Sequence, residues 1–309
     1  MLEHVKWFTD PKPFPTHYEL LLSPPVILSF ALGLVAIGIA FWIQHNIAEP
    51  RVLRVLERFA GYGPLVLRLH LGVALIVAAI FDLLFVPSLH LEEKGALGAA
   101  ILVLEGIAGV SLLLGLATRA GAIVLAILGV IAMQPFDFES ILEQIHILGI
   151  AVFLFLIGGG RLSLDRVRGV QPPIEHDLVP MAALGALRIL MGFGIAYTAL
   201  TEKLLDPALA QSLIERYPQV ALNRHVGVSD AAFIWAAGTT ELAIGLVIMS
   251  GQLTRPVMAV GAVLFTSTLF VFGWAELLGH LPFFGIMFLL FIAPSADPSR
   301  VRRALRPAA

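Results

Sequence analysis

The sequence predicts an all-helical integral membrane protein, and three observations carry that prediction: composition, long apolar runs and a repeated residue pattern. Of the 309 residues, 58% are hydrophobic and 14% are charged, whereas an ordinary soluble domain has about 25% charged residues. The apolar runs do not alternate with polar residues, as the strands of a membrane barrel would. We therefore expect transmembrane helices.

Nine apolar runs are long enough to be membrane spans. A hydrocarbon layer of about 30 Å needs roughly 20 residues in helical form. The nine runs cover residues of about 24–43, 64–88, 93–114, 120–135, 139–159, 181–205, 230–249, 256–273 and 275–293. The proline-rich segment before the first run does not have the pattern of a cleaved signal peptide. Because Lys and Arg are concentrated in the loops after odd-numbered spans, we expect the N-terminus outside and the C-terminus in the cytoplasm.

A repeated pattern predicts two four-helix units. The segment Leu67–Gly72 matches Leu187–Gly192, and later positions correspond in the same order: Glu105 with Glu241, Gly109 with Gly245, Gly115 with Gly251, Thr118 with Thr254 and Arg119 with Arg255. Since each unit has an even number of spans, the two repeats run parallel. The predicted organisation is an external tail, extra helix and cytoplasmic amphipathic elbow at 1–63, units at 64–168 and 181–298, a linker at 169–180 and a basic cytoplasmic tail at 299–309.

Charged residues inside the predicted spans are costly and therefore informative, since each costs about 2.5 to 3.5 kcal/mol at mid-span. Arg68 and Glu105 recur as Arg188 and Glu241. We expect each Arg to pair with the Glu of its own unit, either within a functional pocket or only to fix the helix register.

A second polar group is predicted near the outer face. Glu143 and His146 share one helix face, as do Glu276 and His280. A carboxylate beside an imidazole can exchange protons near neutral pH, although the histidines could equally make structural hydrogen bonds. For Glu139 and Glu276 we favour solvation at a span end, and for Lys203 an extended side chain that reaches the outer surface.

Several chemistries are excluded or disfavoured by residues that the sequence lacks. The absence of cysteine excludes thiol exchange and thiolate metal or iron–sulfur sites, and no metal ligands are assigned. A net charge of -2 gives no indication of a nucleic-acid partner. Haem is disfavoured because His70, which could pair with His146, is replaced by Leu190 in the second unit.

These motifs together resemble the DoxX-like membrane proteins. The resemblance rests on Leu-Arg-x-x-x-Gly, on Glu-x-x-x-Gly followed by Gly-x-x-Thr-Arg, and above all on the sequence Gly-Gly-Gly-Arg-Leu-Ser-Leu-Asp at 158–165. The match is good over about 64–168 and looser over about 181–295, where the second unit lacks the glycine cluster. The resemblance implies a prokaryotic inner-membrane helical bundle, in several family members associated with quinone-linked oxidoreductases.

The leading hypothesis is a quinone-binding membrane subunit that relays protons and receives electrons from a redox partner protein. Its predicted catalytic residues are Glu105, Glu143, His146, Glu241 and His280, and its predicted quinone-binding residues are Arg68, His70, Arg188 and Glu276. The alternatives are a small-solute transporter or channel and a structural anchor for a partner protein. The bilayer is the expected environment, and a homo-oligomer remains open.

Overall fold

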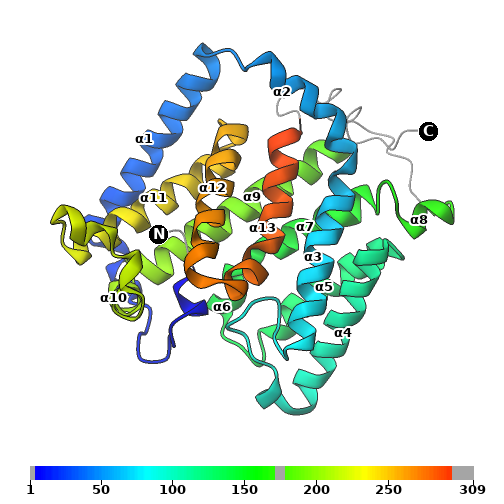
Figure 1. Cartoon of the computed structure of the whole chain (residues 1–309), viewed down its shortest axis with the longest axis horizontal. Helices are drawn as coiled ribbons and strands as arrows, with labels where there is room; N and C mark the ends of the chain where they lie inside the picture. The colour runs from blue at the N-terminus through cyan, green and yellow to red at the C-terminus, as the bar shows by residue number, and fades with distance from the viewer. Residues whose placement is uncertain (1–3, 171–177, 294–309) are drawn as a thin grey trace.

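The computed structural model describes residues 4–170 and 178–293, and all regular elements in these ranges are helical (Figure 1). Seven segments are long and apolar enough to cross a membrane, which confirms the predicted all-helical class. The long helices are α1 Pro24–Asn46, α3 Gly63–Ile80, α4 Gly95–Leu114, α9 Leu178–Ala199, α11 Asp230–Ser250, α12 Thr254–Phe272 and α13 Trp274–Ile292.

Shorter helices connect and extend these segments. Two of them are apolar, α5 Thr118–Ala132 and α7 Ile145–Ile157. The others are α2 Arg51–Leu56, α6 Phe138–Glu143, α8 Leu164–Val167 and α10 Pro207–Arg216. Single 3-10 turns include η1 Val5–Trp7, η2 Tyr18–Leu22 and η3 Glu57–Tyr62, with η4 Glu92–Lys94 before α4 and η6 Pro218–Val220 and η7 Leu222–Val226 before α11. A π-helical segment, η5 Leu200–Leu204, continues α9.

Two helix pairs cross at glycine, which lets their backbones approach closely. A Cβ atom added to Gly72 of α3 would lie 3.0 Å from the carbonyl oxygen of Gly109 in α4. Likewise, a Cβ atom added to Gly192 of α9 would lie 2.6 Å from the carbonyl oxygen of Gly245 in α11. Small residues commonly permit such close packing of helices in membranes.

The remaining helices assemble around these pairs. Helix α7 packs against α9, α13 packs against α3 and α12, and α1 lies along α11 at one side of the molecule (Figure 1). Large apolar side chains are exposed around the bundle, including Val35, Trp42, Val263 and Phe270. A hydrocarbon surrounding explains this exposure, because water would disfavour so many apolar side chains on one surface.

The segment before α1 packs into the bundle from His4 onward. Val5 is fully buried, and Trp7 lies against Gly279 of α13, where any side chain beyond hydrogen would overlap the indole ring. The Arg216 guanidinium donates to the carbonyl oxygen of Phe8 at 2.8 Å. The N-terminal segment therefore covers one end of the helical bundle and contributes side chains to its interior.

Candidate functional site

Arg68 caps helix ends and does not pair with Glu105, so the expected Arg68–Glu105 ion pair is wrong. Its guanidinium is fully buried and donates to four carbonyl oxygens, those of Leu112, Leu113, Gly159 and Leu162. The first two lie at the C-terminus of α4, where unpaired carbonyl groups and the helix dipole favour a cation. Arg68 is a structural cap in this geometry.

The motif at 158–165 forms the other half of this cap. Gly159 and Leu162 supply two of the carbonyl acceptors. Asp165 accepts from the N–H groups of Ala117 and Thr118 at 2.6 and 2.8 Å, which caps the N-terminus of α5. The most specific motif of the sequence therefore fastens α4, α5 and α7 to α3.

Arg188 occupies a corresponding place beneath Gly251. A Cβ atom added to Gly251 would overlap the Arg188 guanidinium, just as one added to Gly115 would overlap Arg68. Its expected partner, Glu241, instead forms an ion pair with Lys203 at 2.7 Å. The expectation that Lys203 extends to the outer surface is therefore also wrong, since its side chain is buried.

Glu105 has a different environment from Glu241. One carboxyl oxygen accepts the N–H of Phe85 at 2.8 Å, and the other is buried without a hydrogen-bond partner. Phe85 lies in the left-handed region with φ 63°. Glu105 thus holds an irregular turn after α3 and lies apart from the other predicted catalytic residues.

Six buried residues gather at the end of the bundle that the N-terminal segment covers, and we call them the imidazole cluster. They come from five places in the fold: His4 before η1, Glu143 of α6, His146 of α7, Glu202 of η5, and Glu276 and His280 of α13. The sequence predicted four of them as site residues, Glu143, His146, Glu276 and His280. The structure adds His4 and Glu202.

The π-helical segment explains how Glu202 and its neighbour Lys203 both point inward. Consecutive residues of an α-helix point about 100° apart, so one of them normally faces outward. The wider π turn alters this spacing and is common at functional sites. In η5, Thr201, Glu202 and Lys203 are all buried.

Lys6 links the N-terminal segment to two carboxylates. Its ammonium group lies 2.5 Å from Glu139 and 2.6 Å from Glu143, and Thr201 also donates to Glu143 at 3.0 Å. Burial of Lys6 favours the neutral amine, but the Glu143, Glu202 and Glu139 carboxylates outweigh it and raise the pKa of Lys6. Lys6 therefore stays charged. Glu139 also accepts from Tyr18, so it is held by the N-terminal segment.

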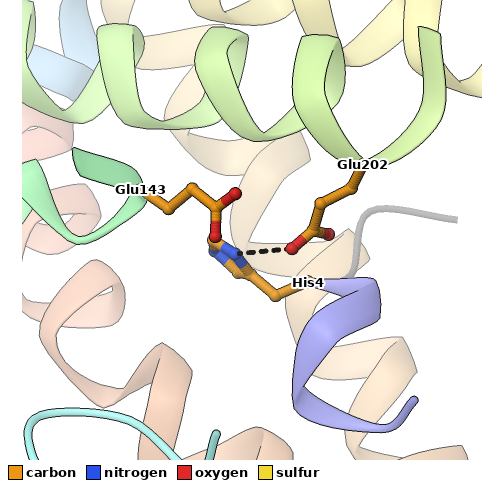
Figure 2. Close-up of side chains that lie close together, drawn as sticks. All are labelled: His4, Glu143 and Glu202. Atoms are coloured by element: carbon orange, nitrogen blue, oxygen red, sulfur yellow. Dashed lines mark ion pairs between the residues drawn. The ribbon is translucent and has the colours of Figure 1, made fainter. Parts of the chain in front are cut away.

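Glu202 and His4 face each other, with Glu143 beside them (Figure 2). The Glu202 carboxylate accepts the N–H of Val5 at 2.5 Å and thus caps η1. The His4 Nδ1 atom lies 4.0 Å from Glu202 Oε1, beyond hydrogen-bond length. Burial and the nearby His280 and His146 lower the pKa of His4, so its imidazole is neutral near pH 7.

Glu276 and His280 form the part of the cluster on α13. The His280 Nδ1 atom lies 3.1 Å from Glu276, and Thr268 of α12 donates a hydrogen bond to the same carboxylate. Both residues are fully buried, so the expected solvation of Glu276 at a span end is wrong. Helix α13 runs unbroken through Pro282, which keeps the two side chains on one face.

Several imidazole nitrogens in the cluster lack hydrogen-bond partners among the described residues. Both ring nitrogens of His146 and Nε2 of His280 are buried without a hydrogen-bond partner, as is Nδ1 of His4, whereas Nδ1 of His280 contacts Glu276. The rings are held by stacking, His146 on Phe283 at 3.8 Å and His280 on Phe265 at 4.1 Å between centroids. Buried polar atoms are normally satisfied, so such a group of exceptions calls for a functional explanation.

Two apolar hollows lie between the helices, and the first of them borders the cluster. A cavity of about 180 Å³ is lined by α9, α11, α12 and α13, and Phe265 forms part of its wall. A groove of about 600 Å³ lies between α3, α12 and α13 and is lined by His70. Met258 and Met287 line both, so the two hollows adjoin. His70 Nδ1 contacts the carbonyl oxygen of Val66 at 2.8 Å.

Sequence reasoning missed the contributions of His4, Lys6 and Trp7. Each lies far along the chain from its partners, and a short polar tail shows no apolar period that would place it in a core. The sequence did offer one indication that this segment packs into the bundle. A His, a Lys and a Trp lie within four residues, which is unusual for an exposed linker.

No family model matches the chain, and comparisons with curated proteins and with solved structures find no match either.

Proposed function

We propose that the chain is a membrane subunit of a quinone-linked oxidoreductase system, which binds quinone from the bilayer and relays protons to it. The observation that carries the proposal is the position of Phe265. One face of its ring stacks on His280, and the same side chain lines the apolar cavity. A quinone head group in the cavity would lie one aromatic layer from the imidazole cluster.

The cavity and groove suit the two parts of a quinone. Apart from His70, their lining residues are apolar or aromatic, and the groove lies between α3, α12 and α13. An isoprenoid tail favours such a surface, because its transfer from lipid to protein loses no hydrophobic contact. His70 would then mark the side of the groove from which the tail enters.

The cluster supplies the acid–base groups that quinone chemistry requires. Reduction of a quinone to a quinol takes up two electrons and two protons. Glu276 and His280 are in contact, and His146 has both nitrogens unpartnered, so these groups can hold and pass protons. The proposed electron source is a redox partner protein, because the described residues include no redox-active side chain of the thiol type.

Quinone binding is tested by filling the cavity. Gly261 lines it, and an added side chain there would first meet the flexible end of Met287. Gly261→Leu should weaken the binding of decylubiquinone to the purified chain at least tenfold, measured by equilibrium dialysis in mild detergent. Val263→Leu, on the exposed face of the same helix, is the matched control and should bind as the wild type does.

Two results would count against this proposal. One is failure of the wild-type chain to bind the quinone, and the other is an unchanged affinity of Gly261→Leu for it. A third variant separates binding from proton relay. His280→Gln should retain quinone binding, because Phe265 stands between the ring and the cavity, but should slow the proton-coupled reduction of bound quinone by a chemical donor.

We further propose the finer architecture of nine spans in two parallel DoxX-like units, in a prokaryotic inner membrane with the N-terminus outside. The paired features that support it are Arg68 beneath Gly115 and Arg188 beneath Gly251, together with the two glycine crossings. In this arrangement α5 and α7 are short spans.

The proposed orientation can be tested by cysteine labelling, since the chain has no cysteine of its own. Single variants Lys12→Cys and Arg168→Cys should react with a membrane-impermeant maleimide from opposite sides of the membrane. Labelling of both from one side would exclude the proposed topology.

A further inference from the structure

Three ligand atoms converge where the N-terminal segment meets the helices. The imidazole of His4 and the carboxylates of Glu143 and Glu202 each offer one atom, and these atoms all lie within 4.8 Å of one another. Figure 2 shows the three side chains pointing toward a common centre from three separate elements. No sequence motif links them, because His4 and Glu202 are about two thirds of the chain apart.

The distance between His4 and Glu202 fits an ion between them better than a direct contact. Nδ1 and Oε1 are 4.0 Å apart. Bonds from zinc to histidine nitrogen and carboxylate oxygen are about 2.0 to 2.2 Å long, so two ligands of a tetrahedral ion lie about 3.4 Å apart, and His4 and Glu202 would close by about half an ångström on binding. A direct hydrogen bond would instead require about 3 Å.

The unpartnered nitrogen of His4 is an independent indication of a ligand. His4 is 5% exposed, and its Nδ1 atom has no hydrogen-bond partner among the described residues. Stacking on Trp7 at 4.2 Å fixes the plane of its ring, so the nitrogen is held toward the two carboxylates. A neutral imidazole with a free nitrogen lone pair is the form that binds metals.

The charges around the site also favour a cation. Three buried or half-buried carboxyl groups, Glu139, Glu143 and Glu202, lie around the ammonium group of Lys6, and Glu241 lies against that of Lys203. Lys6 pairs with Glu139 and Glu143, and Lys203 pairs with Glu241. Burial disfavours the ionised form of such carboxyl groups, and a divalent ion bound between Glu143 and Glu202 would stabilise both as carboxylates.

We propose that His4, Glu143 and Glu202 bind one divalent transition-metal ion. One imidazole and two carboxylates form a mixed nitrogen–oxygen set, which suits Mn²⁺, Fe²⁺ or Zn²⁺ better than Mg²⁺ or the thiolate-preferring Cu⁺. Glu143 can serve Lys6 and the ion together, since a carboxylate has two oxygens. The ion would fasten the N-terminal segment to α6 and η5. This inference does not depend on quinone binding.

The test uses the full chain in mild detergent, treated with a chelator and then titrated with Mn²⁺, Fe²⁺ under anaerobic conditions, Zn²⁺ or Co²⁺. Metal content is measured by plasma mass spectrometry, and we expect one ion per chain for at least one of these metals. His4→Ala, Glu143→Gln and Glu202→Gln should each weaken binding by at least tenfold. Bound Co²⁺ should show a visible absorption band that His4→Ala changes or removes.

Glu139→Gln and His17→Ala are the matched controls. Glu139 contacts the same Lys6 but lies outside the ligand set, and His17 is an exposed histidine of the same segment. Both should bind the metal as the wild type does. Absence of binding by the wild type would overturn the proposal, as would unchanged binding by the three ligand variants.

Misfolding of a variant is excluded by a second measurement. Hydrogen exchange at η1 reports whether the N-terminal segment is docked without metal. If Glu143→Gln docks normally and still fails to bind, the loss is a ligand effect, which supports the site. If Glu139→Gln loses binding as strongly as Glu143→Gln does, the loss follows general charge and the proposed ligand set is wrong.

Discussion

The two ends of the bundle bury polar groups in opposite ways. One end, which we call the capping region, contains Arg68, Asp165 and Arg255. The two arginines donate to carbonyl oxygens at helix C-termini, and Asp165 accepts from N–H groups at a helix N-terminus. At the other end the imidazole cluster holds nitrogens without partners. The ends are separated along α7 and α13 by roughly 20 Å, at 1.5 Å per residue. Both are rich in charge, yet only one is satisfied by the backbone.

This difference separates structure from function. A buried charge that caps helix ends has its hydrogen-bonding capacity filled by the fold itself and needs no ligand. A buried imidazole with free nitrogens adds nothing to stability, and an unsatisfied polar group is destabilising. The capping region therefore explains how the helices are held together, and the imidazole cluster is where a proton, a quinone or a metal ion would act.

The largest expected effect is on the capping region. Arg68→Met should lower the free energy of unfolding by about 3 to 5 kcal/mol, because four buried carbonyl groups lose a charged donor. Thermal unfolding in detergent measures the loss. Arg119→Met is the control, since Arg119 is exposed and makes a single hydrogen bond, to Leu156, and it should change little. Equal effects of the two substitutions would remove the distinction between capping and surface arginines.

The next effect is on docking of the N-terminal segment as the pH falls. The pKa of His4 is lowered by burial and by His280 and His146, so protonation favours the undocked segment. Docking should be strongest above the ordinary histidine pKa of about 6.5 and weaken below it, by up to about 1.4 kcal/mol per pH unit. Hydrogen exchange of Val5 and Trp7 measures this.

The variant His4→Asn provides the control for that pH dependence. This variant should remove the weakening of docking that protonation of His4 causes between pH 6.5 and 5. Any pH dependence of docking that Glu143 and Glu202 cause should remain. If the N-terminal segment of the wild type docks equally well at pH 5 and pH 8, the pKa of His4 is not lowered by burial as the structure indicates.

A smaller effect is expected at Asp165. Asp165→Asn should cost about 1 to 2 kcal/mol, because an amide offers one oxygen acceptor where the carboxylate serves two N–H groups of α5. Asp137→Asn is the matched control, since Asp137 caps α6 through Ser140 but is exposed to its surroundings. It should cost less than Asp165→Asn in the same thermal unfolding measurement.

The sequence could place the helices because apolar runs report directly on burial in lipid. It could also place Glu276 with His280, since spacing along one helix fixes which residues share a face. Glu143 and His146 lie instead on separate helices, because the helix is interrupted at Gln144. The sequence did not reveal the partners of Arg68, because backbone carbonyl groups have no sequence signature. For the same reason, Asp165 was recognised as part of a motif without its capping role.

Contacts between distant segments set the other limit. Depth along a helix follows from residue number, but rotation about the helix axis does not. Lys203 was therefore assigned to the surface, whereas the π-helical turn of η5 directs it to Glu241. The insertion of Val5 and Lys6 depends on contacts with residues more than 130 positions away, and a single sequence contains no periodicity that would indicate them.

The smallest expected change in stability tests the imidazole cluster itself. His146 is fully buried, and neither of its nitrogens has a hydrogen-bond partner in the part of the chain that the structure describes. His146→Leu should leave the free energy of unfolding within about 1 kcal/mol of the wild type or raise it, because replacing an unsatisfied polar group by an apolar one removes a desolvation penalty. The loss of stacking on Phe283 opposes this gain. Thermal unfolding in detergent again provides the measurement.

His146→Asn sharpens the same comparison. The amide keeps polar atoms in the site but is smaller than the ring, so this variant should be less stable than His146→Leu. Comparison with Arg68→Met then tests the difference between the two ends of the bundle. Loss of a polar side chain should lower the free energy of unfolding strongly only where that side chain is hydrogen-bonded to the backbone. If His146→Leu lost 3 kcal/mol or more, His146 would have a structural partner and the cluster would be a second capping region.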